Sequence, residues 1–172
     1  MQQNDKKNID KFDLLKIMVT AEDHDVVPLL VTGSSMQPFL LDRETVVYLE
    51  KDSAYRPKRG DIILYWRGDD VWVLHRAVRV YEDGKIRTNG DGQNWTEVIH
   101  ASQVVAHVVS FVRKGRTVSA DSRFYRFLVA VWMPLRWIHP FAAWCTHVIR
   151  RLPYKLFPKY MAKRDHKDGL DG

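Results

Sequence analysis

The first two thirds of the chain alternate between short apolar runs and turn-forming residues. Each run is rich in Val, Ile, Leu or Tyr and is bounded by Gly, Asp, Arg or Pro, which is typical of β-strands. We expect strands over residues 26–32, 45–50, 61–66, 71–81, 85–88 and 104–112. Asp83-Gly84, between the fourth and fifth of these, is a strong signal for a tight hairpin turn. The pattern predicts one compact, mainly β domain with mostly antiparallel strands over residues 26–120.

The N-terminal segment, residues 1–25, has a helical pattern. Apolar residues recur at near-helical spacing between Ile9 and Ala21, which predicts a short amphipathic helix. The segment mixes Lys with Asp, and it has neither the apolar core that signal peptides carry nor a small-residue cleavage site. We therefore expect no cleavable signal peptide.

The pattern changes again at about Ser122, near the start of a C-terminal extension over residues 121–172. Residues 124–149 are rich in Trp and Phe but are interrupted by Arg, by His and by two prolines, Pro134 and Pro140. A membrane-spanning helix needs about 20 nearly uninterrupted apolar residues, so this stretch does not predict a clean span. We expect a helical, amphipathic extension.

Composition and charge narrow the class of protein. The 172 residues, 45% hydrophobic and 28% charged, suit one folded domain with a short appendage and exclude wholesale disorder. The single cysteine, Cys145, excludes an internal disulfide and a cysteine zinc site. Residues 121–172 hold 10 Lys or Arg against 4 Asp, whereas residues 1–120 hold 17 basic and 17 acidic residues. The net charge of +6 therefore belongs to the extension, which points to an acidic partner.

A membrane surface is the partner that the extension suits best. Trp132, Trp137 and Trp144 are of the residue type found at lipid headgroup depth, and basic residues flank them on both sides. We expect a membrane-associated protein whose residues 124–164 make peripheral, monotopic contact with the lipid surface. The sequence does not determine on which side of the membrane the protein lies. The alternative is that two core helices cap the β domain. No nucleic-acid partner is expected, because the aromatic residues form an apolar block and do not alternate with basic residues as base-stacking platforms do.

A serine at the end of the first predicted strand is a candidate nucleophile. The strand ends at Gly33, and Ser35 follows, with Pro38 three residues later to begin a turn. A hydroxyl at such a tight strand-to-turn corner is exposed, and its own backbone N–H points toward the carbonyl oxygen that it attacks. Taken alone, a serine in a turn is more often a capping or turn residue.

A serine nucleophile needs a general base, and His75 is the candidate. Strand alternation places His75 on the same apolar face as Val71, Val73 and Ala77. Burial there favours the neutral imidazole that a general base requires at about pH 7. The alternative is a core histidine satisfied by a backbone carbonyl. Lys85 competes for the same role, but it lies at the tip of the predicted hairpin, where water keeps an amine charged.

Four motifs, in the same order, resemble those of the signal peptidase I superfamily of serine peptidases, which is related to the self-cleaving LexA-type repressors. They are Gly33-x-Ser35-Met36-x-Pro38, Arg59-Gly60-Asp61-Ile62, Leu74-His75-Arg76-Ala77-Val78 and Thr88-Asn89-Gly90-Asp91. The third motif resembles the endoplasmic-reticulum and archaeal variant, in which histidine replaces the lysine of the common bacterial enzymes. The resemblance covers residues 26–113 and implies a signal-peptidase/LexA-like antiparallel β domain.

The resemblance also implies roles for individual residues. Ser35 corresponds to the nucleophile, and His75 to the general base that takes its proton and later protonates the leaving amine. Asp91 is the candidate for orienting His75, and Glu97, the acidic residue a few positions on, is the alternative. Many members have a serine two residues before the nucleophile as an oxyanion donor, where this chain has Gly33. The Ser35 backbone N–H is then the expected donor, with a neighbouring group as a possible second one.

The sequence predicts a serine endopeptidase that cleaves a leader or signal peptide or a small precursor by a Ser-His mechanism. An extended polypeptide would bind by strand addition, and the resemblance implies small residues next to the scissile bond. No cofactor or metal is expected, because the histidines lack ligand spacing and Gly90-Asp91-Gly92 is not a phosphate loop. One alternative is a catalytically inactive, membrane-associated peptide-binding module of the same fold. A self-cleaving regulatory domain is disfavoured, because residues 1–25 are too short for a helix-turn-helix and a cleavable linker.

Overall fold

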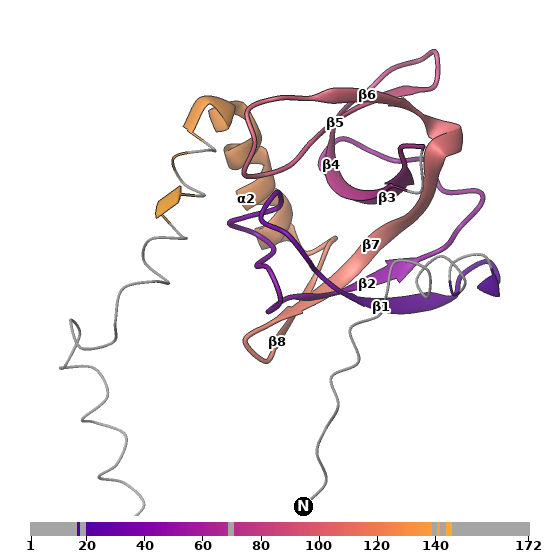
Figure 1. The fold of residues 1–172 in the computed structure, drawn as a ribbon, viewed down its shortest axis with the longest axis horizontal. Coiled ribbons are helices and arrows are strands. Elements are labelled where there is room, and N and C mark those ends of the chain that lie inside the picture. Colours follow the sequence, from indigo (N-terminus) through magenta and orange to yellow (C-terminus); the bar gives the residue numbers. More distant parts are fainter. Residues whose placement is uncertain (1–16, 18–19, 69–70, 139–140, 142–143, 146–172) are drawn as a thin grey trace, which may run out of the picture.

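The computed structural model describes residues 17, 20–68, 71–138, 141 and 144–145. Within them, eight strands form one antiparallel sheet in the order β1-β2-β7-β3-β4-β5-β6, and β8 pairs with β7 outside this path. The strands are β1 (Val26–Leu30), β2 (Val46–Glu50), β3 (Ile62–Trp66), β4 (Trp72–Val80), β5 (Lys85–Asn89), β6 (Glu97–His100), β7 (Val104–Arg113) and β8 (Arg116–Ser119). Figure 1 shows that the sheet is strongly curved and that helix α2 (Arg123–Trp132) lies along one side of it.

The mainly β, antiparallel architecture expected from the sequence is confirmed, and so is the predicted hairpin. β4 and β5 pair on either side of Asp83-Gly84, where Gly84 has a φ of 78°. The short strands β6 and β8 were not predicted. Their sequences, EVIH and RTVS, are too short and too polar to give an apolar run. They are strands because they pair with β5 and β7. Their own sequence pattern therefore does not predict them.

Two apolar clusters lie on opposite faces of the central strand β3. Ile62 and Leu64 belong to one cluster, together with residues of β1, β2, β7 and α2, whereas Ile63 and Tyr65 belong to the other. β3 is therefore buried on both faces. The same alternation continues on β4, where His75 faces the second cluster and Arg76 faces the first. Adjacent residues of β4 therefore lie in two different environments.

Helix α2 packs against the sheet with one face. The Ser122 side chain caps the helix by accepting a hydrogen bond from the Tyr125 backbone N–H. Tyr125 and Val129 are buried in the first cluster, and Arg126 binds Asp61 at 2.6 Å. The chain then continues as a 3-10 helix, η2 (Met133–Ile138). In the part of the chain that the structure describes, no helix is long and apolar enough to cross a membrane.

Two sequence predictions fall partly outside the described residues. Of the helix expected between Ile9 and Ala21, the structure describes residues 17, 20 and 21, and residues 17 and 20 are helical. Of the predicted membrane-contact segment, residues 124–164, the structure describes nothing after Cys145. The described start of this segment packs on the β domain through one face of α2.

Candidate active site

Ser35 lies in the turn that follows β1. Gly33 has a φ of 96°, a conformation that residues with a side chain rarely adopt, and its N–H donates to Asp42 Oδ1 at 2.8 Å. Ser35 is half-buried, and its hydroxyl makes no hydrogen bond with any described residue. Its backbone carbonyl accepts a hydrogen bond from the Gly92 N–H at 2.8 Å. The backbone of Ser35 is therefore held in place while its hydroxyl stays available.

A cleft of about 210 Å³ opens beside Ser35. It is lined mainly by apolar residues from β1 and the turn after it, from β3, and from the start of β4: Leu29, Leu30, Val31, Thr32, Met36, Leu64, Trp72, Val73 and Leu74. Residues 72–74 directly precede His75 along β4. β1 is an edge strand, since it pairs only with β2 in the described sheet. The cleft thus lies at an open sheet edge, next to the strand that carries His75.

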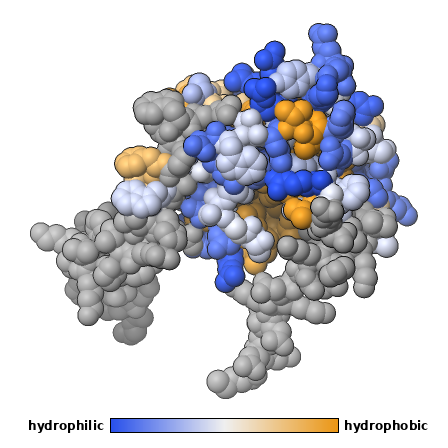
Figure 2. Space-filling model, turned by 45° about the horizontal axis from the view of Figure 1, so that its top comes forward, coloured by the Kyte–Doolittle hydropathy of each residue, from blue (hydrophilic) through white to orange (hydrophobic). Residues whose placement is uncertain are grey.

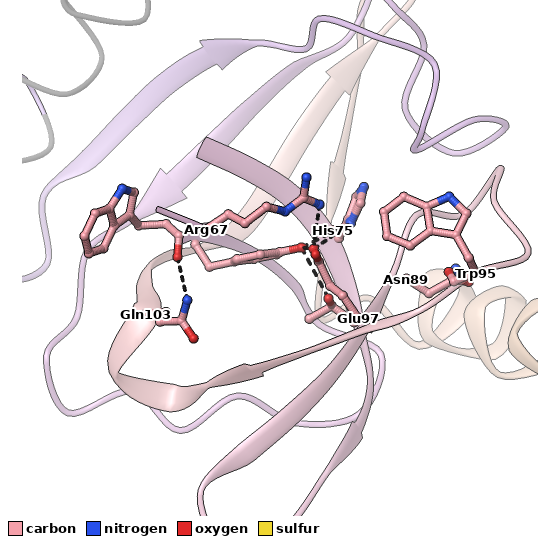
Figure 3. A network of polar contacts seen from close by, with 9 residues as sticks. Arg67, His75, Asn89, Trp95, Glu97 and Gln103 are labelled. Atoms are coloured by element: carbon pink, nitrogen blue, oxygen red, sulfur yellow. Dashed lines mark hydrogen bonds and ion pairs between the residues drawn. The ribbon is translucent and has the colours of Figure 1, made fainter. Parts of the chain in front are cut away.

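His75 is buried, with 3% of its surface exposed. Its Nδ1 lies 3.3 Å from the Tyr65 hydroxyl and 3.9 Å from Glu97 Oε1, and the ring of Trp95 meets its ring edge-on with 6.1 Å between centroids. Figure 3 shows Arg67, His75 and Glu97 converging, with Trp95 beside the imidazole. Among the described residues no hydrogen bond joins His75 to Ser35.

The hydrogen bonds of Tyr65 indicate which nitrogen of His75 carries the proton. Tyr65 donates its one hydroxyl hydrogen to Glu97 Oε1, because a carboxylate only accepts. The Tyr65 oxygen has no second hydrogen to donate, so the contact with His75 Nδ1 assigns the imidazole proton to that nitrogen. The lone pair is left on Nε2, the nitrogen that a general base presents to a nucleophile.

The charge state of His75 follows from its surroundings. Burial, with a smaller effect from the positive charge of Arg67, lowers the pKa of His75 to about 4. The Glu97 carboxylate acts in the opposite direction, but Arg67 binds it at 2.8 Å and offsets its charge. Burial also raises the pKa of Glu97. The imidazole is therefore neutral at about pH 7, as the apolar face of the predicted strand indicated.

Asp91 lies elsewhere, which corrects the expectation that it orients His75. Both of its carboxylate oxygens bind Arg76, at 2.7 Å from Nε and 2.6 Å from an Nη atom. Arg76 is fully buried and also donates to the Gly60 carbonyl and the Tyr125 hydroxyl. Because Arg76 and His75 are consecutive in β4, they point to opposite faces, and Asp91 is on the Arg76 face. Glu97, the alternative carboxylate, is the one beside His75.

The loop between β5 and β6 contacts both halves of the site. A Cβ atom at Gly90 would lie 2.7 Å from the Ser35 carbonyl oxygen and 2.6 Å from Gln93 Oε1, so only glycine fits there. The Asn89 side-chain amide donates to the carbonyls of Gln93, at 3.2 Å, and of Trp95. One loop therefore holds the serine backbone at its start and places Trp95 against His75 at its end.

Tyr65 and Arg67 were not among the predicted site residues. A signal was present, because Ile63 is the cross-strand partner of His75 and Tyr65, two residues later, shares the face of Ile63.

The competing base, Lys85, is exposed and binds Asp83 at 2.6 Å, and this contact raises the pKa of Lys85. A lysine held in its charged form does not act as a base at about pH 7.

No three His, Cys, Asp or Glu side chains within the described ranges are grouped so that they could hold a metal ion. No protein-family model matches the chain, and no curated protein matches it. The geometry of the site is thus the main ground for a functional conclusion.

Proposed function

We propose that the protein is a serine endopeptidase with a signal-peptidase/LexA-like β domain, in which Ser35 is the nucleophile and His75 the general base. One observation carries the proposal. A buried, neutral imidazole with Nδ1 engaged lies on β4, the residues just before it line the cleft beside Ser35, and the Ser35 hydroxyl has no hydrogen-bond partner among the described residues. Glu97 and Tyr65 are positioning residues, because they act on the peptide bond only through His75.

The proposed reaction proceeds in two balanced halves. Ser35 Oγ attacks the scissile carbonyl carbon while its proton moves to His75 Nε2, and the resulting oxyanion accepts a hydrogen bond from the Ser35 backbone N–H. The C–N bond then breaks, and the leaving amine takes the proton from His75. Water attacks the acyl-enzyme ester in the second half, giving its proton to His75, which returns it to the Ser35 oxygen as the carboxylate product leaves. General-base catalysis of this kind contributes about 10²- to 10⁴-fold to the rate.

The cleft suggests how a polypeptide substrate would bind. An extended chain can add to the free edge of β1 by main-chain hydrogen bonds, which places alternate side chains toward Ser35. The lining residues Val31, Met36 and Leu74 are apolar, and a cleft of about 210 Å³ has room for a small or medium apolar side chain. This fits a leader or signal peptide or a small precursor with a small residue next to the scissile bond.

A fluorophosphonate probe and a library of leader peptides test the proposal. Wild-type protein should be labelled at Ser35, as located by mass spectrometry of the digest, and should cleave members of the library. Ser35→Ala should abolish both, and His75→Ala should reduce both by about 10³-fold. Ser34→Ala is the matched control, because Ser34 is the exposed neighbour in the same turn and should leave both unchanged.

The missing Ser35–His75 hydrogen bond supports a second candidate, a catalytically inactive, membrane-associated peptide-binding module of the same fold. In that case leader peptides would bind wild-type protein and Ser35→Ala alike, with no labelling and no cleavage by either. Labelling of wild-type Ser35 would exclude this candidate. The absence of labelling together with saturable peptide binding would replace the endopeptidase proposal with it.

A further inference from the structure

Helix α2 has two apolar faces, and only one of them is covered. Tyr125 and Val129 are buried in the core. The other face exposes Phe124 to 73% and Phe127 to 64%, and Leu128 and Val131 are exposed beside them. A surface helix that packs by one face normally carries polar residues on the other. This outer face is therefore an interaction surface without a described partner.

A basic hairpin lies next to this face. The tip between β7 and β8 carries Arg113, Lys114 and Arg116, and all three line a groove of about 760 Å³ with Phe124 and Leu128 of α2. Arg113 is anchored by donating to the Pro38 carbonyl at 2.8 Å. The side chains of Lys114 and Arg116 are exposed and form no ion pair or hydrogen bond with any residue that the structure describes. The hairpin and the helix that follows it in the chain thus form one surface, apolar on α2 and cationic on the hairpin tip.

We propose that this surface, the outer face of α2 with the tip of the β7–β8 hairpin, docks the protein onto an anionic membrane. Phe and Leu side chains enter the boundary between headgroups and acyl chains, while Lys and Arg bind lipid phosphates, which is the division found along this surface. Figure 2, drawn from one side of the molecule, shows apolar side chains emerging among hydrophilic ones, so exposure alone does not identify the surface. The cations that lie beside the exposed apolar residues identify it.

Charge decides between a membrane and a second copy of the chain. In a two-fold dimer through this face, the cations of one hairpin tip would lie against the equivalent apolar and cationic surface of the partner, without an acidic group to pair with. An anionic bilayer supplies that negative charge. The extension is also basic as a whole, since residues 121–172 hold 10 Lys or Arg against 4 Asp.

Vesicle flotation of the full chain tests the surface. Wild-type protein should float with vesicles of phosphatidylcholine and phosphatidylglycerol, and much less with phosphatidylcholine alone. Lys114→Gln with Arg116→Gln should weaken binding to the anionic vesicles about 25-fold, because each cation near such a surface contributes about fivefold. Phe124→Ser with Phe127→Ser should reduce binding to both vesicle types, and neither pair should unfold the protein, because all four side chains are exposed.

Matched controls come from β5 and β6, at one end of the sheet. Lys85→Gln changes a cation at another hairpin tip, and Val98→Ser changes an exposed apolar residue of β6, so both should bind as wild type does. Binding by the two double variants equal to wild type would overturn the proposal, including the case in which residues after Cys145 carry all the affinity. Self-association in the absence of lipid that Phe124→Ser with Phe127→Ser abolishes would overturn it in favour of a dimer. Ser35→Ala should float like wild type, so failure here is distinct from failure of the endopeptidase proposal.

Discussion

The Tyr65 hydroxyl links Glu97 to His75, and a single oxygen atom can be removed to test this link. Tyr65→Phe deletes the acceptor of His75 Nδ1 and leaves the ring in the core. We predict that fluorophosphonate labelling of Ser35 slows by about 10-fold, because the imidazole then samples other orientations and tautomers. The labelling rate as a function of pH is the measurement.

Two further variants show whether Tyr65 acts through its hydroxyl. Tyr48→Phe removes a hydroxyl from a half-buried tyrosine on β2 and should not change the rate. Glu97→Gln should slow labelling and alter its pH profile in the same direction as Tyr65→Phe. Identical rates and profiles for Tyr65→Phe and wild-type protein would show that Tyr65 does not position His75.

The lowered pKa of His75 also predicts how stability depends on pH. In the folded protein His75 stays neutral down to about pH 4, whereas in the unfolded chain it takes up a proton at about pH 6.5. The unfolded state therefore binds more protons between these two pH values. The free energy of unfolding falls as the pH drops through this window, and the stabilising contribution of His75 is fully present above it. Between about pH 7 and about pH 5 the loss from His75 is about 2 kcal/mol.

Urea denaturation of wild-type protein and His75→Leu at these two pH values measures this contribution. The variant should lose about 2 kcal/mol less than wild type on acidification, because leucine does not titrate. His24→Leu is the control with the opposite sign, since Glu50 raises the pKa of that exposed histidine. An equal acid-induced loss in wild type and His75→Leu would contradict a buried neutral imidazole.

Among the connecting elements, the β5–β6 loop contacts the backbone of Ser35 directly. Gly90 needs no unusual backbone conformation, but a Cβ there would come within 2.7 Å of the Ser35 carbonyl oxygen, closer than real Cβ atoms approach an atom. We predict that Gly90→Ala displaces the serine turn and lowers Ser35 labelling by about 10²-fold, since a shift of about 1 Å has this effect on positioned groups.

Asn94→Ala, an exposed substitution in the same loop, is the matched control and should label at the wild-type rate. Far-UV circular dichroism separates a displaced turn from an unfolded protein. Wild-type labelling of a folded Gly90→Ala would mean that the loop does not position Ser35.

At the scale of the whole molecule, the buried Arg76–Asp91 pair joins the sheet to helix α2. Arg76 belongs to β4, Asp91 to the β5–β6 loop and Tyr125 to α2, and the Asp91 backbone carbonyl also accepts from Trp132 Nε1 at 3.3 Å. Breaking a buried pair leaves an unpaired charge, which costs about 3–5 kcal/mol. We predict that Asp91→Asn lowers the free energy of unfolding by about this amount, measured by urea denaturation.

The exposed Asp83–Lys85 pair provides the control, because Asp83→Asn should leave stability nearly unchanged. Asp91→Asn should also keep the wild-type pH profile of Ser35 labelling, since the residue acts on the fold and not on His75. A folded, fully stable Asp91→Asn with an altered pH profile would restore the role that the family resemblance assigns to it.

Local patterns were enough to predict the antiparallel strands, the Asp83-Gly84 hairpin and the burial of His75. Alternation and turn preference act over a few neighbouring residues, so a one-dimensional pattern contains them. The face of β4 on which His75 lies was for the same reason predictable, and with it the neutral imidazole.

Contacts between segments that are distant in the sequence could not be predicted in this way. Glu97, together with Tyr65, lies beside His75, whereas Asp91 pairs with Arg76. The path of the chain from the β5–β6 loop into β6 puts these two carboxylates on opposite faces of β4. Such pairings depend on which chain segments fold beside one another, and no spacing along the sequence encodes that.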